Sequence, residues 1–139
     1  MSKNTRVHVT LDRAALDRIS TRKMVQGLKA AGVVGEAAVK VDLSKAGTGK
    51  TYSRGGKTHT ASAPGHSPAV DSGTLRRSVG HEVRASARTG IVSIFANTEY
   101  ALALEEGKGK LRGPRPFVSL LGTKHLSKLV AAFKRGARQ

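Results

Sequence analysis

Residues 62–78 read SAPGHSPAVDSGTLRRS and form the most organised junction in the chain. Proline restricts its own backbone and that of the residue before it, so Pro64 and Pro68 set the path of this loop. Asp71 then precedes a short basic segment, where its carboxylate can accept backbone N–H bonds from a first helical turn. The stretch therefore predicts a shaped loop and a polar cap, followed by a short helix or turn over residues 73–79.

A long helix is predicted before this junction. Residues 7–11 alternate apolar and polar side chains as a strand does, and Asp12 is placed to cap a short helix that ends at Ile19. Apolar and small residues then recur every three or four positions over residues 21–43, which is typical of a helix with a small-residue face. Because glycine costs a helix roughly 1 kcal/mol relative to alanine, the glycines of this segment predict a break near residues 32–35.

Residues 45–70 contain almost no large apolar side chain and are rich in Gly, Thr, Ser and Lys. Such a composition predicts a long, mobile basic loop, because a segment of this kind has little apolar surface to bury. After the junction, residues 79–84 and 90–96 have the pattern of two strands, and the glycine-containing segment 88–90 lies where a hairpin turn is expected.

The last third of the chain predicts two further helices. Residues 99–106 are expected to form a short helix with Tyr100, Ala103 and Leu104 on its inner side, and residues 107–113 a basic glycine loop. Pro116 is expected to open a final helix, whose apolar stripe extends to Phe133. The expected fold class is α+β, with a long N-terminal helix, a small antiparallel sheet with a central hairpin, a short helix, a C-terminal helix and a long basic loop. The length of 139 residues predicts one domain over residues 1–139.

The charge of the chain is strongly positive. It holds 25 Lys and Arg against 9 Asp and Glu, a net charge of +16. Acids are absent from residues 43–70 and from residue 107 to the end. These segments are either solvated basic surface or a face that meets DNA or an acidic partner; the basic residues that would form such a face are Lys45, Lys50, Arg54, Lys57, Lys108, Lys110 and Arg112.

No segment predicts a membrane span or a signal peptide, since no apolar run approaches the roughly 20 residues that cross a bilayer. The expectation is a soluble chain that acts in the compartment where it is made. The absence of cysteine excludes disulfide and thiolate chemistry and leaves the redox compartment open.

The polar motifs give no convincing active site. Residues 47–51, GTGKT, imitate the end of a phosphate-binding loop, but Ser44 stands where that loop needs glycine. The histidines are too scattered for a metal site. His66, Asp71 and Ser72 are close in sequence only, and Glu105 and Glu106 point in different directions on a helix. The prediction is that the chain has no catalytic residue, cofactor or metal and is not an enzyme.

Three phrases of the sequence, taken in order, resemble one protein family. The first is SAPGHSPAVDSGTLRRSV at residues 62–79. The second is ANTEYA at residues 96–101, followed by LEEG at residues 104–107. The third is RPF at residues 115–117. The order and spacing are similar to those of the small tail-completion, or head–tail joining, proteins of long-tailed phages. The resemblance covers about residues 60–134, and the loop before the first phrase is longer and more basic than the family pattern.

The resemblance implies a structural virion protein of the phage neck or head-proximal tail, assembled in the host cytoplasm and without enzymatic activity. It implies a six-fold cyclic homo-oligomer that joins tail to head around the DNA passage. The implied neighbours are tail-terminator, tail-tube or head-closure proteins, with non-specific contact to genomic DNA and no membrane. The residues it assigns to assembly are Pro64, Pro68, Asp71, Gly73, Leu75, Arg76, Tyr100, Glu105, Arg115 and Phe117.

Two other interpretations remain open. A small basic cytoplasmic nucleic-acid-binding protein fits the net charge and the Lys- and Arg-rich glycine loops, although Tyr52 is the one aromatic residue in a basic loop that could stack on a base. A toxin-like or hydrolytic enzyme would depend on His66 and Asp71. Assembly state and nucleic-acid affinity separate the first of these from the virion interpretation.

Overall fold

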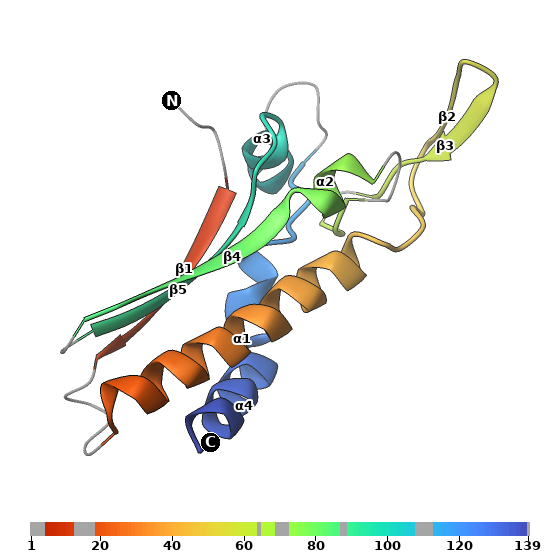
Figure 1. Ribbon diagram of the computed structural model, residues 1–139. Helices are drawn as coiled ribbons and strands as arrows, with labels where there is room; N and C mark the ends of the chain where they lie inside the picture. Colours follow the sequence, from red (N-terminus) through yellow and green to blue (C-terminus); the bar gives the residue numbers. More distant parts are fainter. Residues whose placement is uncertain are drawn as a thin grey trace.

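The computed structural model in Figure 1 has the predicted α+β fold and describes residues 5–12, 19–63, 65–68, 73–86, 89–107 and 113–138. Its elements, in chain order, are β1 (Thr5–Asp12), α1 (Thr21–Asp42), β2 (Thr51–Arg54), β3 (Lys57–Thr60), α2 (Thr74–Arg77), β4 (Val79–Ala85), β5 (Thr89–Ala96), α3 (Ala101–Glu106), the 3-10 helix η2 (Ser119–Gly122) and α4 (Leu126–Ala137).

The main sheet has three antiparallel strands in the order β1-β5-β4. The predicted hairpin of β4 and β5 is confirmed, and β1 pairs with the other edge of β5, so that Val9 lies opposite Val92 and Val7 opposite Ile94. Alternate residues of β5 are buried on the face that packs against α1. The short helix predicted after Asp12 falls mainly on residues 13–18, which lie outside the described residues. Asp12 itself is the last residue of β1.

The long helix is confirmed as α1, whose first turn is capped by the Ser20 hydroxyl accepting from the Lys23 N–H at 3.2 Å. The predicted break near residues 32–35 is wrong, because α1 is continuous through them. Its glycines are packing positions: a Cβ on Gly32 would collide with the His81 ring, and one on Gly35 would lie 2.6 Å from Ile94 Cδ1. Tertiary packing therefore outweighs the low helix propensity of glycine here.

Close packing of small residues also brings α4 against α1. A Cβ on Gly136 would lie 2.7 Å from the Gln26 carbonyl oxygen, and one on Gly27 would lie 2.6 Å from the Phe133 ring. The main core lies between these helices, the sheet and the loop after α3. Its largest fully buried side chains include Phe117, which is 0% exposed.

The end of the chain differs from the prediction. The final helix begins at Leu126 rather than Pro116, because residues 113–118 form an irregular loop and η2 follows it. The short helix 99–106 is present as α3, but the predicted inner position of Tyr100 is wrong, since its side chain is 46% exposed. Ala101 is buried in its place, and Leu104 packs against the core from the same helix.

A second, separate sheet lies within the predicted long basic loop. Strands β2 and β3 form an antiparallel hairpin, in which Tyr52 lies opposite His59. Gly55 and Gly56 connect them with positive φ angles of 55° and 77°, as a two-residue hairpin turn requires. The sequence prediction missed this hairpin, although a Gly-Gly pair between threonine-rich runs is its recognised signal.

Candidate functional site

The three phrases that carry the family resemblance meet in space. The Gly65 N–H donates to the Pro114 carbonyl at 2.8 Å, and the Arg115 N–H donates to the Leu104 carbonyl at 2.7 Å. Arg115 also reaches the first phrase, since its Nε donates to the Ser62 carbonyl at 3.1 Å. We call these contacts, together with Glu105 and residues 114–119, the motif junction.

The Glu105 side chain holds the third phrase and the residues after it by accepting hydrogen bonds from their backbone. Its carboxylate accepts the N–H groups of Phe117 and Val118 at 3.0 and 3.1 Å, and that of Ser119 at 3.1 Å. A carboxylate that accepts several backbone N–H bonds is a strong cap for the chain that it faces. The loop is thereby held in the conformation that puts Phe117 into the core.

Arg115 braces the junction from the other side. In addition to its bond with Ser62, its Nη1 donates to the Gly113 carbonyl at 2.8 Å. A guanidinium that holds two carbonyls in fixed directions is suited to this role, because its donors form a rigid planar set. Arg115 therefore ties the start of the first phrase to the loop before Phe117.

The helix α2 is fastened to the end of α1. Arg76 Nη1 donates to the Ser44 hydroxyl at 2.9 Å, and Leu75 packs against the main core. The predicted short helix after the polar cap is confirmed as α2, preceded by Gly73 with a φ of 80°. Pro68 and Gly73 are buried, whereas Pro64 and Asp71 lie outside the described residues.

The predicted assembly residues thus fall into two groups. Three of them support the junction from within: Glu105, Arg115 and Phe117 are buried or half-buried, and their hydrogen bonds or apolar contacts are internal. Tyr100 is the clearly exposed member among those that the structure describes.

The β2–β3 hairpin with its base, residues 49–61, is the most prominent surface feature, and we call it the arm. Figure 1 shows it extending from one end of α1, clear of the other helices and strands. Its base is tied by the Gly49 N–H donating to the Ala61 carbonyl at 2.7 Å and the Ala61 N–H donating to the Lys50 carbonyl at 2.9 Å. Gly47 packs so closely on the Thr60 carbonyl that a side chain there would collide with it.

The arm presents basic and aromatic groups to solvent. Lys50 and Lys57 are exposed, and Lys50 Nζ lies 5.5 Å from the centre of the Tyr52 ring, which is 51% exposed. Arg54 lies in β2, but its side chain is outside the described part, as are Lys108, Lys110 and Arg112 altogether. Lys45 differs from Lys50 and Lys57, because its ammonium pairs with Asp42 at 3.3 Å.

A buried polar cluster around Asp42 was not predicted from the sequence. Asp42 is 2% exposed, its Oδ2 lies 2.6 Å from His125 Nε2, and its Oδ1 accepts from Lys124 at 3.0 Å. Burial raises the pKa of Asp42, but its hydrogen bonds with His125, Lys124 and Lys45 outweigh burial and hold that pKa below its usual value. An acid in the last turn of a helix opposes the helix dipole, and this is the sequence signal that Asp42 needs a partner.

A second carboxylate, that of Glu36, links α1 to the sheet. Its Oε2 lies 2.6 Å from His81 Nδ1 on β4, and its Oε1 accepts from Lys40 at 2.6 Å. Burial raises the pKa of Glu36, but the hydrogen bonds with Lys40 and His81 outweigh burial, so the net shift of that pKa is downward. No group of three or more potential metal ligands occurs among the described residues.

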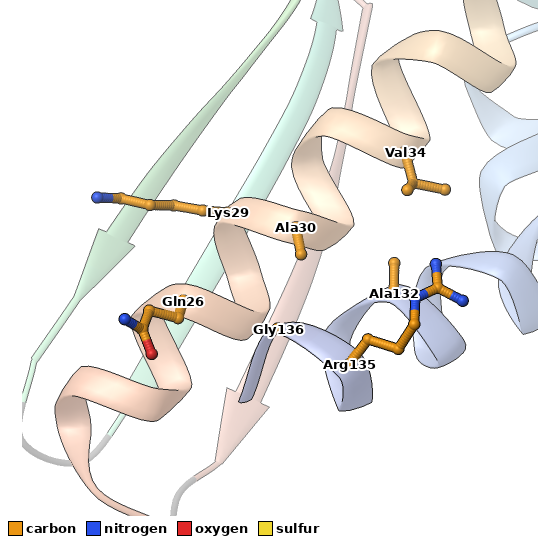
Figure 2. Close-up of a pocket in the computed structure, with 7 residues that line it drawn as sticks. All are labelled: Gln26, Lys29, Ala30, Val34, Ala132, Arg135 and Gly136. Atoms are coloured by element: carbon orange, nitrogen blue, oxygen red, sulfur yellow. The ribbon is translucent and has the colours of Figure 1, made fainter. Parts of the chain in front are cut away.

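A groove of about 320 Å³ lies between α1 and α4, and its lining is Gln26, Lys29, Ala30, Val34, Ala132, Arg135 and Gly136. Figure 2 shows Arg135 lying along the groove near Ala132, whereas the side chain of Lys29 extends away from α4. The lining has no acid and no hydroxyl or thiol group. The groove is a consequence of the close helix crossing, and its residues offer no catalytic set.

The apparent phosphate loop is likewise without a helix to support it. Residues 47–51 lead into β2, whereas a phosphate loop delivers the backbone N–H groups of a helix N-terminus to its ligand. In the suggested triad, Asp71 and Ser72 lie outside the described residues.

Across the part of the chain that the structure describes, no helix is long and apolar enough to span a membrane. Comparisons of the chain with protein-family models, with curated proteins and with solved structures find no match.

Proposed function

We propose that the chain is a structural protein of a phage neck or head-proximal tail, which assembles into a six-fold ring that joins tail to head around the DNA passage. The observation that carries the proposal is the motif junction. Three phrases that resemble one family, separated by up to about 50 residues, contact one another through Gly65, Leu104 and Arg115. Three phrases that matched the family pattern by chance would not be expected to contact one another in the fold.

The surface of the chain supports assembly with neighbours. The arm extends into solvent, and two valines of α1, Val33 and Val41, are 59% and 61% exposed. Exposed apolar side chains on a helix are suited to burial against another subunit. The proposed neighbours beyond the ring are tail-terminator, tail-tube or head-closure proteins, and the proposed location is the virion. No catalytic activity, cofactor or membrane association is part of the proposal.

The second candidate is a small cytoplasmic nucleic-acid-binding protein. The net charge of +16 favours it, together with the exposed lysines and Tyr52 of the arm. Charge of this kind supports salt-sensitive binding to phosphates without reading of sequence. In a ring, the same charge allows non-specific contact with the DNA that passes through.

The deciding experiment measures mass and shape in solution. Light scattering after size exclusion and negative-stain electron microscopy are expected to show a closed ring that binds random duplex DNA weakly. A chain that stays monomeric over a wide concentration range and binds duplex DNA or RNA tightly at low salt would overturn the ring and favour the second candidate.

Gene order gives an independent test. The proposal expects portal and head-closure genes upstream of the coding sequence and a tail-tube gene downstream. Ribosomal or metabolic genes on both sides would contradict it.

A further inference from the structure

We propose that one face of the arm binds the phosphate backbone of duplex DNA. We call it the basic face, and it comprises Lys50, Tyr52, Lys57 and His59. The inference rests on the proposed function, which places DNA beside the chain, and it names the surface that meets that DNA.

The arm has two chemically different faces. Cross-strand partners in an antiparallel ribbon share a face, and successive residues of one strand alternate between faces. The register pairs Tyr52 with His59, and Lys57 lies two residues before His59 on the same strand, so these three residues share one face. The positions of the opposite face, which we call the hydroxyl face, carry only hydroxyl side chains: Thr51, Ser53, Thr58 and Thr60.

Two side-chain contacts agree with this division. Lys50 Nζ lies 5.5 Å from the centre of the Tyr52 ring, so Lys50 belongs to the basic face although it precedes β2. On the hydroxyl face, Thr51 Oγ1 and Thr60 Oγ1 lie 3.0 Å apart. The hairpin register therefore gathers cations and an aromatic ring on one side of a narrow ribbon.

The basic face is open to solvent. Lys50 and Lys57 are exposed, and the Tyr52 side chain is 51% exposed. No residue of the arm is an acid. Figure 1 shows the arm extending clear of the other helices and strands, so a large partner can approach it. The complement of this face is a partner with dense negative charge.

The length of the basic face suits duplex DNA. Arg54 is the register partner of Lys57 and follows Lys50 by four residues, so the two lysines lie about 13 Å apart along the ribbon at ~3.3 Å per residue. Duplex DNA carries one charge per ~1.7 Å of its axis, and a contact of this length meets about eight phosphates. A two-stranded ribbon is also narrow enough to enter the major groove.

An acidic protein is a poorer match. The cores of protein interfaces are depleted in charge and enriched in apolar and aromatic groups. Tyr52 is the one large apolar side chain in the sequence of the arm. Phosphate contact needs only the lysines, and it reads no base sequence. In the proposed ring, such contacts let DNA of any sequence slide past the arms.

The test compares lysine substitutions on the arm with a matched pair elsewhere. The arm variant is Lys50→Gln with Lys57→Gln, and the control variant is Lys128→Gln with Lys134→Gln, at two exposed positions of α4. Each loses two positive charges from +16, so both carry +14. Fluorescence anisotropy with a labelled random-sequence duplex measures affinity between about 0.05 and 0.2 M sodium chloride.

The arm variant is expected to bind at least about tenfold more weakly at about 0.05 M salt. The slope of log K against log salt should become shallower by about two for each arm that contacts the duplex, because two phosphate contacts are lost. The control variant should lose less than about threefold and keep the slope of the unmodified chain. Equal losses in the two variants would mean that affinity follows net charge, and would overturn the contact.

A second control addresses the opposite side of the same ribbon. Ser53→Gln with Thr58→Gln enlarges the hydroxyl face without changing charge and is expected to leave the DNA affinity unchanged. A loss as large as that of the arm variant would contradict the assignment to the basic face. Circular dichroism melting checks that all variants fold.

Two other polyanions test the choice of partner. Poly-glutamate that binds as tightly as duplex DNA at the same concentration of negative charge would assign the face to acidic proteins and overturn the DNA contact. Single-stranded poly-dT that binds more tightly than the duplex, and loses this advantage in Tyr52→Leu, would make the face a base-stacking platform and overturn the duplex contact.

The outcomes separate this contact from the proposed function. An arm variant that binds the duplex as tightly as the control variant overturns the contact, while a ring seen by light scattering still stands. A chain that binds the duplex through its arm but never forms a ring supports the contact and overturns the proposed ring.

Discussion

At the scale of single residues, two carboxylates hold the molecule together from within. Glu105 caps the backbone of residues 117–119, and Asp42 joins the end of α1 to the start of α4 through His125. The residues next to them, Glu106 and Val41, are exposed. An acid next to an exposed residue in the sequence can therefore support the fold from within. We expect substitution of such an internal acid to change stability more than substitution of an exposed one.

Glu105→Ala is expected to destabilise the fold by on the order of 3 kcal/mol, because three backbone N–H groups lose a charged acceptor. Urea unfolding followed by circular dichroism measures the change. Glu99→Ala is the matched control, an exposed acid before the same helix, and is expected to change stability by less than about 0.5 kcal/mol. Equal effects of the two substitutions would contradict the capping role.

Acid is expected to destabilise the fold through Asp42. The native pKa of Asp42 is lowered, so the unfolded chain takes up this proton first as the pH falls and then binds more protons than the native state. The Asp42 contribution is present above the unfolded pKa of about 4 and is lost as the pH falls through the lower native value. Urea midpoints between about pH 2 and 6 should fall with acid and change less in Asp42→Asn.

Glu36 provides the comparison for this titration. Its pKa is also lowered, so Glu36→Gln should remove a further part of the acid sensitivity and the double variant more than either single one. A double variant whose midpoint falls with acid as steeply as that of the unmodified chain would contradict both assignments.

At the scale of elements, glycine positions decide how closely the helices and the sheet approach. Gly35→Ala gains helix propensity but is expected to destabilise the fold by about 1–3 kcal/mol, because the new methyl group meets Ile94 at 2.6 Å and Leu129 at 3.0 Å in the core. Thermal unfolding measures it. At Gly122 the same exchange meets nothing within 4 Å and should be close to neutral. A stabilised Gly35→Ala would show that the core can yield.

The elements that sequence predicted well are those with a strong apolar period. Residues 21–43 and the β4–β5 hairpin were predicted nearly to their ends, because their side-chain patterns record which face is buried. The break in α1 was wrong because propensity says nothing of what a glycine packs against, here the His81 ring. The predicted start of the last helix was wrong because Glu105 accepts the backbone N–H groups of residues 117–119, where the loop ends and η2 begins, and this long-range contact has no local signal in the sequence.

The candidate site was likewise predicted only in part, because the sequence does not show which distant segments contact one another. The phrases at residues 62–79, 96–107 and 115–117 could be recognised in the sequence, but only the fold shows that they contact one another. The arm was missed because its side chains are polar and carry no apolar period, so its single signal was Gly55 with Gly56. The Asp42 cluster joins residues 83 positions apart and required the structure.

At the scale of the whole molecule, the excess of positive charge sets two opposite responses to salt. Charges of one sign repel within the folded chain and favour expansion, and salt screens this repulsion. Attraction to a polyanion or to an acidic neighbour is screened by the same ions. Stability of the isolated subunit should therefore rise with salt while its association with DNA falls.

The melting temperature of the unassembled subunit is expected to rise by a few degrees, about 3 °C, between about 0.01 and 0.15 M sodium chloride, as the Debye length shortens from about 30 to 8 Å. Sodium fluoride should give the same rise, since the cause is screening and not chloride binding. Lys128→Glu lowers the net charge from +16 to +14 and should raise the melting temperature at low salt more than at high salt. A melting temperature that falls with salt would mean that attractive ion pairs such as Arg6 with Glu82 outweigh the repulsion of the excess positive charge.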